Sequence, residues 1–168
     1  MAVTSEILRS YRAPRKVMRR LLAAAERDDR PEARALAYLF LGCLIIFLSQ
    51  LPSLVSFHAV SADAPPVEAL VGVTFFSWMF VWPLLFYLLA AIVHLIARAF
   101  GGKGSFSRAR VALFWTVLAV SPLMLLRGAV ESVAGQGGAL AVLDGAIALA
   151  FCALWAVSLI EAEAPSTV

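Results

Sequence analysis

The side chains with the greatest chemical potential lie in apolar stretches of the chain. Asp144 lies within a long apolar run, and Arg127 lies near the end of the run before it. A charge is costly in hydrocarbon, so each residue is a candidate for an ion pathway or a structural pair. The two would lie near the same membrane boundary, where they can pair across a short loop, although Glu131 competes for Arg127. We favour the structural ion pair, because deeper polar groups for transport are sparse.

Other chemistries lack the residues that they need. Cys43 and Cys152 lie in apolar runs without the spacing of a metal site, which favours buried packing thiols. The two histidines, His58 and His94, lie on opposite predicted sides of the membrane, and no glycine-framed serine accompanies them. We therefore expect no enzyme activity, no metal and no cofactor.

Composition places these groups on membrane helices. The chain has 168 residues, of which 62% are hydrophobic and 15% charged, with a mean hydropathy of +0.88. The predicted fold is all-α, a polytopic transmembrane helix bundle, since four runs can cross a core of about 30 Å. The second run is overlong with Pro83 near its middle, so one kinked helix is favoured over a hairpin. The predicted spans are about 35–55, 70–100, 109–126 and 139–160.

Basic residues give the orientation. Of the fourteen Lys and Arg residues, all but Arg127 lie before the first run or around the gap between the second and third. Because these residues accumulate on the cytoplasmic side, both termini are predicted to be cytoplasmic, and 56–69, with Asp63, lies outside. A signal peptide cleaved near Ser61–Ala64 is the alternative, but the first run is too long for one. The excess charge of +3 lies beside apolar segments, which favours anionic lipid headgroups over nucleic acid as its partner.

Residues 1–34 are predicted to be a cytoplasmic basic amphipathic segment. Successive helical residues are rotated by about 100°, which separates basic from apolar side chains after Pro14. The basic side, a predicted membrane-surface face, consists of Arg15, Lys16, Arg19 and Arg20. The apolar side consists of Val17, Met18, Leu21 and Leu22. Two interpretations stay open, because the apolar side can lie in the headgroup layer or pack on the protein itself.

Small residues form a stripe along the fourth run. They recur at intervals of three or four residues, so they share one narrow helix face on which backbones can approach closely. The stripe consists of Ala141, Gly145, Ala148, Cys152 and Ala156. We expect it to pack inside the bundle rather than against a second copy, so that Gly145→Leu loosens the bundle.

The link between the second and third runs is the most distinctive stretch. Its first two glycines can end a helix, and its serine can cap the next. It is not a phosphate-binding loop, because Gly104 separates Lys103 from Ser105. The stretch consists of Gly101, Gly102, Lys103, Gly104, Ser105 and Phe106.

With the helix end His94–Arg98 and the Ser121–Pro122 step, this stretch resembles the bacterial branch of the Yip1-type integral membrane proteins. Trp155 and the Tyr11–Arg15 segment, which is similar to alphaproteobacterial members, add to the likeness. The resemblance implies a bundle, commonly of five spans, in the bacterial inner membrane and without an established catalytic site. Eukaryotic relatives are associated with trafficking and small GTPases, but their Tyr-Gly-Pro-type motif is absent here.

Three parts are thus predicted: the segment 1–34, the bundle 35–160 and a short acidic tail, 161–168. The expected function is that of a non-enzymatic membrane protein that organises or assists membrane partners, whether another protein or a second copy. The alternative is a small transporter or channel subunit with Asp144 in its pathway.

Overall fold

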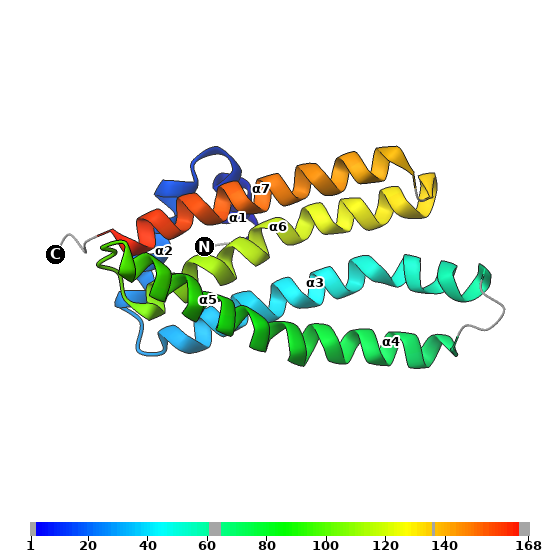
Figure 1. The fold of residues 1–168 in the computed structure, drawn as a ribbon, viewed down its shortest axis with the longest axis horizontal. Coiled ribbons are helices and arrows are strands. Elements are labelled where there is room, and N and C mark those ends of the chain that lie inside the picture. Colours follow the sequence, from blue (N-terminus) through cyan, green and yellow to red (C-terminus); the bar gives the residue numbers. More distant parts are fainter. Residues whose placement is uncertain (1–2, 61–64, 136, 165–168) are drawn as a thin grey trace.

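The computed structural model describes residues 3–60, 65–135 and 137–164. These residues form helices and no strand, which confirms the all-α prediction (Figure 1). In chain order the elements are α1 (Val3–Arg12), α2 (Pro14–Glu26), α3 (Pro31–Val60), α4 (Val67–Phe76), the π-helical turn η1 (Ser77–Val81), α5 (Trp82–Ala99), α6 (Phe106–Ala134) and α7 (Gly138–Glu163). The predicted cleavage site at 61–64, with Asp63, lies outside the described residues.

Four of these helical stretches are long and apolar enough to cross a membrane, as the sequence predicts. Each is longer than its predicted span. The third is expected to stop near 126, yet α6 continues to Ala134, because Arg127 is paired with Glu131 one turn later and with Asp144. The four stretches are Pro31–Ala59, Val67–Ala99, Phe106–Val133 and Gly138–Glu163.

The second span is one helix, and the alternative of a hairpin is wrong. Helices α4 and α5 are continuous through η1, which covers Ser77–Val81. This π turn ends two residues before Pro83, which lies in the first turn of α5 and has no N–H to donate. A single wide turn inside a helix is a recognised way to accommodate such a residue.

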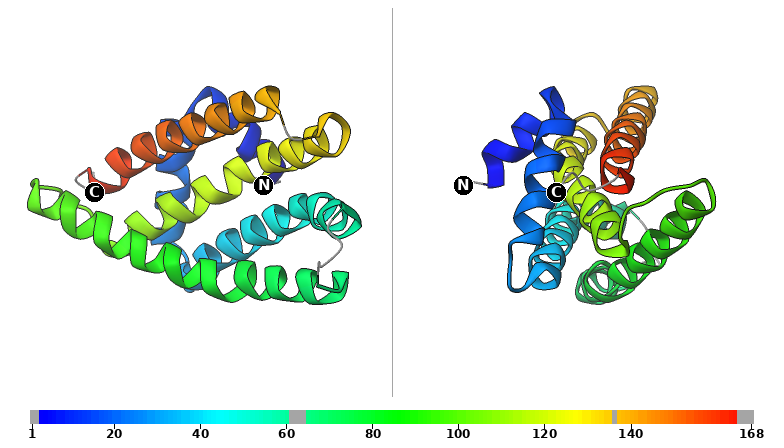
Figure 2. Two further views of the ribbon diagram at one scale, coloured as in Figure 1. Left: turned by 45° about the vertical axis from the view of Figure 1, so that its right-hand side comes forward. Right: turned by 90° about the vertical axis from the view of Figure 1, so that its left-hand side faces the viewer.

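Helix α6 is the centre of the bundle. Helices α3 and α7 pack along it, and α5 contacts it near the same end as α2 (Figures 1 and 2). Two glycines let α3 and α6 approach closely. A Cβ on Gly42 would lie 3.1 Å from the backbone nitrogen of Leu118, and one on Gly128 would overlap the carbonyl oxygen of Ser49. The tightest helix contact is therefore between α3 and α6.

The Ser121–Pro122 step lies in the middle of α6. Pro122 cannot donate to the carbonyl of Leu118, which would otherwise accept a bond from the residue four positions later. The Ser121 hydroxyl donates to that carbonyl instead, at 2.8 Å, and Ser121 is fully buried. The serine thus satisfies the oxygen that the proline leaves free.

The N-terminal helices pack on the bundle. Helix α2 lies across it, near the end where α7 finishes (Figure 2), and contacts α7, α6 and α3. Three residues of its apolar side, Val17, Met18 and Leu22, are buried in the hydrophobic core. The structure thereby decides between the two interpretations of this side, because the protein itself covers it.

The small-residue stripe of α7 lies on the outside, contrary to the prediction. All five of its residues are exposed on the protein surface, and a Cβ on Gly145 would meet nothing within 4 Å. Cys152 is likewise exposed rather than a buried packing thiol, whereas Cys43 is buried. The face of α7 that carries Ile147 packs on α6 instead. The spacing of small residues shows that they share one helix face, but not whether that face is turned toward the protein or toward the outside.

Candidate functional site

The link between α5 and α6 is a fixed turn. Gly101 has a φ of 90°, which ends α5 in the left-handed conformation that glycine adopts without strain. Its N–H donates to the carbonyl of Arg98 at 3.1 Å, and that of Gly102 donates to Ala97 at 2.9 Å, the pair of bonds of a Schellman motif. Ser105 caps α6 by accepting from the N–H of Arg108 at 3.4 Å.

The turn closes over the last residue of α7, Glu163. The N–H of Gly104 donates to Glu163 Oε2 at 3.2 Å, and the N–H of Lys103 donates to its carbonyl at 3.1 Å. From α5, His94 donates through Nδ1 to Glu163 Oε1 at 2.8 Å. Since the carboxylate only accepts, Nδ1 carries the proton. The Glu163 side chain is only 9% exposed, and each of its two carboxylate oxygens has a hydrogen-bond donor in place of water.

Glycine is required at two positions of this turn because Glu163 lies so close. A Cβ on Gly104 would overlap the carbonyl oxygen of Ala162 and lie 2.8 Å from the Cα of Glu163. A Cβ on Gly102 would lie 2.7 Å from Glu163 Oε2 and 2.9 Å from the carbonyl oxygen of Ala97. We name this arrangement of His94, Gly102, Lys103, Gly104 and Glu163 the α7 clasp.

Glu161 connects the clasp to α2. Its carboxylate accepts from Arg19 Nε at 2.7 Å and Nη2 at 3.2 Å, and Arg15 Nε lies 3.8 Å away. The hydrogen bond to Glu161 raises the pKa of Arg19 above its usual range. Arg108 Nη2 donates to the Glu161 carbonyl at 3.1 Å. These bonds join α2, α6 and α7 at one place.

The predicted acidic tail is thereby corrected at its start. Helix α7 runs through Glu163, so both acidic residues belong to the helix and to its contacts, because donors from α2, α5 and the turn surround them. The remainder of the tail, 165–168, lies outside the described residues. The sequence holds the signal that was missed, namely two carboxylates at the end of an apolar run that faces a basic segment.

Phe106, the last residue of the turn, lies between the imidazole of His94 and the guanidinium of Arg110. Its ring centroid is 5.8 Å from that of His94, and the guanidinium of Arg110 lies 4.5 Å above it. Arg110 also pairs with Glu32 at the start of α3. Arg110 also lies 5.6 Å from the ring centroid of Tyr87 on α5, so cation–π contacts and the ion pair hold it between α3, α5 and α6.

Helix α1 is held by two side chains whose partners lie on α6. Trp115 donates through Nε1 to the Ser10 hydroxyl at 3.0 Å, and the Tyr11 hydroxyl donates to the Ala119 carbonyl. Burial raises the pKa of the Tyr11 phenol, so the phenol keeps its proton at neutral pH. Both Ser10 and Trp115 are buried.

The basic side of α2 faces away from the bundle. Arg15, Lys16, Arg19 and Arg20 are all exposed, as their helical spacing implies. Arg15 and Arg19 reach Glu161, whereas Lys16 and Arg20 form no ion pair with any described residue. The bundle thus fixes the helix while two of its four charges stay available.

At the opposite end of the bundle the structure brings Arg127 and Asp144 together. Arg127 donates through Nε to Asp144 Oδ1 at 2.6 Å and through Nη2 to Oδ2 at 3.4 Å. Arg127 Nη1 donates to Glu131 at 2.8 Å, so the competing partner is accommodated as well. The Asp144 side chain is 45% exposed on the protein surface. This pair joins α6 to α7 at their other end.

Neither of two cavities in the described part of the chain suits transport. One, of about 230 Å³, lies between Leu22, Asp28 and Arg108, and its charged groups are paired with one another or with Arg34. The other, of about 10 Å³, lies between α1, α6 and α7. Asp144 and Gln50 line neither cavity. Among the described residues no group of three or more His, Cys, Asp or Glu is placed to hold a metal ion.

A comparison with protein families gives one finding. The family model described as the Yip1 domain matches residues 8–162, from α1 to the last turn of α7. The match includes the turn, the Ser121–Pro122 step and all but the final residue of the α7 clasp. No curated protein and no solved structure matches the chain.

Proposed function

Because the chain belongs to the Yip1 domain family, we propose that it is a non-enzymatic membrane protein that organises or assists membrane partners. The proposed contact surface consists of the exposed basic side of α2 and the Gly101–Phe106 turn. Helix α2 and the turn both contact the end of α7, through Glu161 and Glu163 respectively. The proposed surface thus combines two elements that are both attached to the end of α7.

One observation carries this proposal. The apolar side of α2 packs against the bundle, where Val17 and Met18 are almost completely buried. All four basic residues of the other side are exposed. A helix that served only to fill the core would not need a charged outer face held in one position. Exposed cations on a fixed helix suit an acidic segment of a membrane partner, with anionic headgroups nearby.

Point variants test the surface better than truncation does. Removing residues 1–30 would also uncover the core that Val17, Met18 and Leu22 cover. Lys16→Gln with Arg20→Gln removes two charges that pair with no described residue, so the fold should be kept. A matched control, Arg30→Gln with Arg98→Gln, removes the same charge from exposed positions outside α2.

The measurement is crosslinking in native membranes followed by purification of the full chain and mass spectrometry. We expect a membrane partner to be recovered with the unaltered chain and the control but lost with the α2 variant. Equal recovery with both variants would rule out the α2 surface. Recovery of no partner, together with Asp144-dependent ion flux in proteoliposomes, would support the transporter instead.

We also propose that the protein lies in the bacterial inner membrane with both termini in the cytoplasm, because its basic residues gather at that end of the bundle. Support comes from Figure 1, where α2, the α5–α6 turn and the end of α7 lie together, opposite the α6–α7 connection. Cysteine accessibility in a chain with Cys43 and Cys152 replaced by alanine tests this. A cysteine at Glu68 should react with an impermeant reagent in intact cells and one at Lys103 should not; the reverse would invert the topology.

A further inference from the structure

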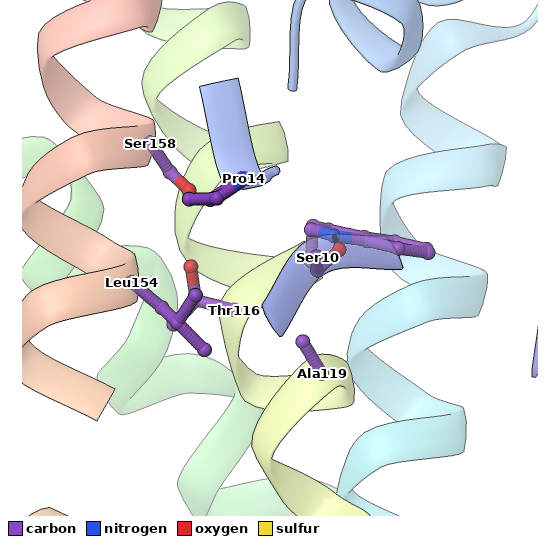
Figure 3. A pocket seen from close by; sticks show the side chains of 7 residues that line it. Ser10, Pro14, Thr116, Ala119, Leu154 and Ser158 are labelled. Atoms are coloured by element: carbon purple, nitrogen blue, oxygen red, sulfur yellow. Dashed lines mark hydrogen bonds between the residues drawn. The ribbon is translucent and has the colours of Figure 1, made fainter. Parts of the chain in front are cut away.

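A small, partly open space lies where the α1–α2 junction meets α6 and α7 (Figure 3). Its volume is about 10 Å³, and hydroxyl groups from three helices line it: Ser10 of α1, Thr116 of α6 and Ser158 of α7. In Figure 3 the hydroxyls of Ser158 and Thr116 come from neighbouring helices and point toward the space between them. The rest of the lining is formed by Pro14, Trp115, Ala119 and Leu154.

Ser158 is the group that needs a partner. It is 3% exposed, and its hydroxyl forms no hydrogen bond with any described residue. A hydroxyl that is so little exposed has lost most of its contact with bulk water and gains no partner from the protein in return. A helical serine often avoids this by bonding to a carbonyl of the preceding turn, as Ser121 does here, yet Ser158 does not.

The other two hydroxyls have acceptor capacity left. Thr116 donates to the carbonyl of Ala112 at 2.8 Å, so both its lone pairs are free to accept. Ser10 donates to the carbonyl of Glu6 at 2.9 Å and accepts from Trp115, which leaves it one lone pair. The space therefore offers one donor and two acceptors, the complement of a water molecule that accepts once and donates twice.

The size agrees with the chemistry. A volume of about 10 Å³ corresponds to roughly one water-sized probe, and buried waters typically form about three hydrogen bonds. We propose that one ordered water molecule occupies this space, accepting from Ser158 and donating to Thr116 and Ser10. It would link α7 and α6 to the N-terminal helices, which the Trp115 and Tyr11 hydrogen bonds already join to α6 beside this place.

Radiolytic hydroxyl-radical footprinting of the full chain in detergent tests the proposal, because radicals form on bound water and oxidise the side chains beside it. Trp115 lines the space and is 3% exposed, so bulk solvent reaches it poorly. Its neighbour Phe114 is fully buried, does not line the space and serves as the internal reference. We expect Trp115 to be oxidised several-fold more than Phe114 after correction for their intrinsic reactivities.

Two variants then decide whether water is the cause. Ser158→Val removes the donor and fills the space, so oxidation of Trp115 should fall several-fold to the corrected level of Phe114. Ser132→Val removes an exposed hydroxyl of α6 and should change nothing. Low oxidation of Trp115 in the unaltered chain, or equal oxidation in the Ser158 variant, would show that the space is dry. If Ser158→Val fails to fold, Thr116→Val with the same readout replaces it.

Discussion

Helices α6 and α7 are both apolar enough to span a membrane, yet they differ in what surrounds them. In the most apolar stretch of α6, 67% of the residues are buried inside the protein. The corresponding stretch of α7 is more apolar, yet only 17% of its residues are buried. In water this order would be reversed, because apolar surface would seek the core. In a bilayer the lipid is itself apolar, so the outer helix can be the more apolar one.

The two helices also differ in where they are fixed. Helix α6 packs on several helices, and α3 lies so close that a Cβ would be crowded at Gly42 and would overlap a backbone atom at Gly128. Helix α7 is held by its partner α6 and by polar contacts at its ends, the α7 clasp at one and the Arg127–Asp144 pair at the other. Packing should therefore dominate the response of α6 to substitution, and polar contacts that of α7.

The largest effect is expected in the α3–α6 contact. Gly128→Ala would place a methyl group on the carbonyl oxygen of Ser49, a backbone atom that cannot rotate away. We expect a loss of about 3 kcal/mol in the free energy of unfolding. Unfolding in mixed detergent micelles, followed by tryptophan fluorescence, measures it. Gly72→Ala on α4 is the control, because nothing lies within 4 Å of its Cβ; equal stability of both variants would contradict the packing difference.

A smaller loss is expected in the α7 clasp. Glu163→Gln keeps the shape of the side chain but removes the charge that accepts from Gly104 and His94. The cost should be about 2 kcal/mol, since bonds to a buried charged acceptor are stronger than those to an amide. Glu68→Gln, an exposed acid in the first turn of α4, should cost little in the same assay. A stable Glu163 variant would mean that α7 is not fixed by this carboxylate.

A still smaller effect is expected at the other end of α7. Arg127→Gln and Asp144→Asn should each cost about 1 kcal/mol, because the pair is partly exposed. The double variant should cost less than the sum of the two, with a coupling of about 0.5 kcal/mol or more. A double-mutant cycle by the same unfolding assay measures this coupling. Strictly additive losses would show that the two side chains do not interact.

The smallest effect is expected on the outer face of α7. Gly145→Leu should change the free energy of unfolding in dilute detergent by no more than about 0.5 kcal/mol, because open space surrounds this glycine. This expectation replaces the sequence-based prediction that the substitution loosens the bundle. A loss comparable to that of Gly128→Ala would show that the stripe is packed after all.

Local features of the chain were predictable because they depend on neighbouring residues. Apolar run length identified the four spans, and glycine and serine chemistry identified the ends of α5 and α6 at Gly101 and Ser105. The pairing of Arg127 with Asp144 also follows from a short connection between two helices. In each case the residues concerned are close in sequence or lie on adjacent helices.

The rest depends on distant contacts that spacing cannot reveal. Arg19 and Glu161, or His94 and Glu163, meet only because α2 and α7 are placed by the whole bundle. Rotation of a helix about its own axis is equally hidden, since a stripe such as that around Gly145 has the same spacing whether it faces lipid or protein. Length and composition identify a membrane-spanning helix, whereas its packing partners determine which of its faces is exposed.

The bond between Arg19 and Glu161 joins residues 142 positions apart. A ribosome therefore completes α2 long before it makes the carboxylate that α2 binds, and α3, α4, α5 and α6 are made in between. Until α6 is made, α1 lacks its partners Trp115 and Ala119, and until α7 is made, α2 lacks Glu161. The docking of α2 on α7 therefore waits until α7 has been made, although the two helices are far apart in the chain.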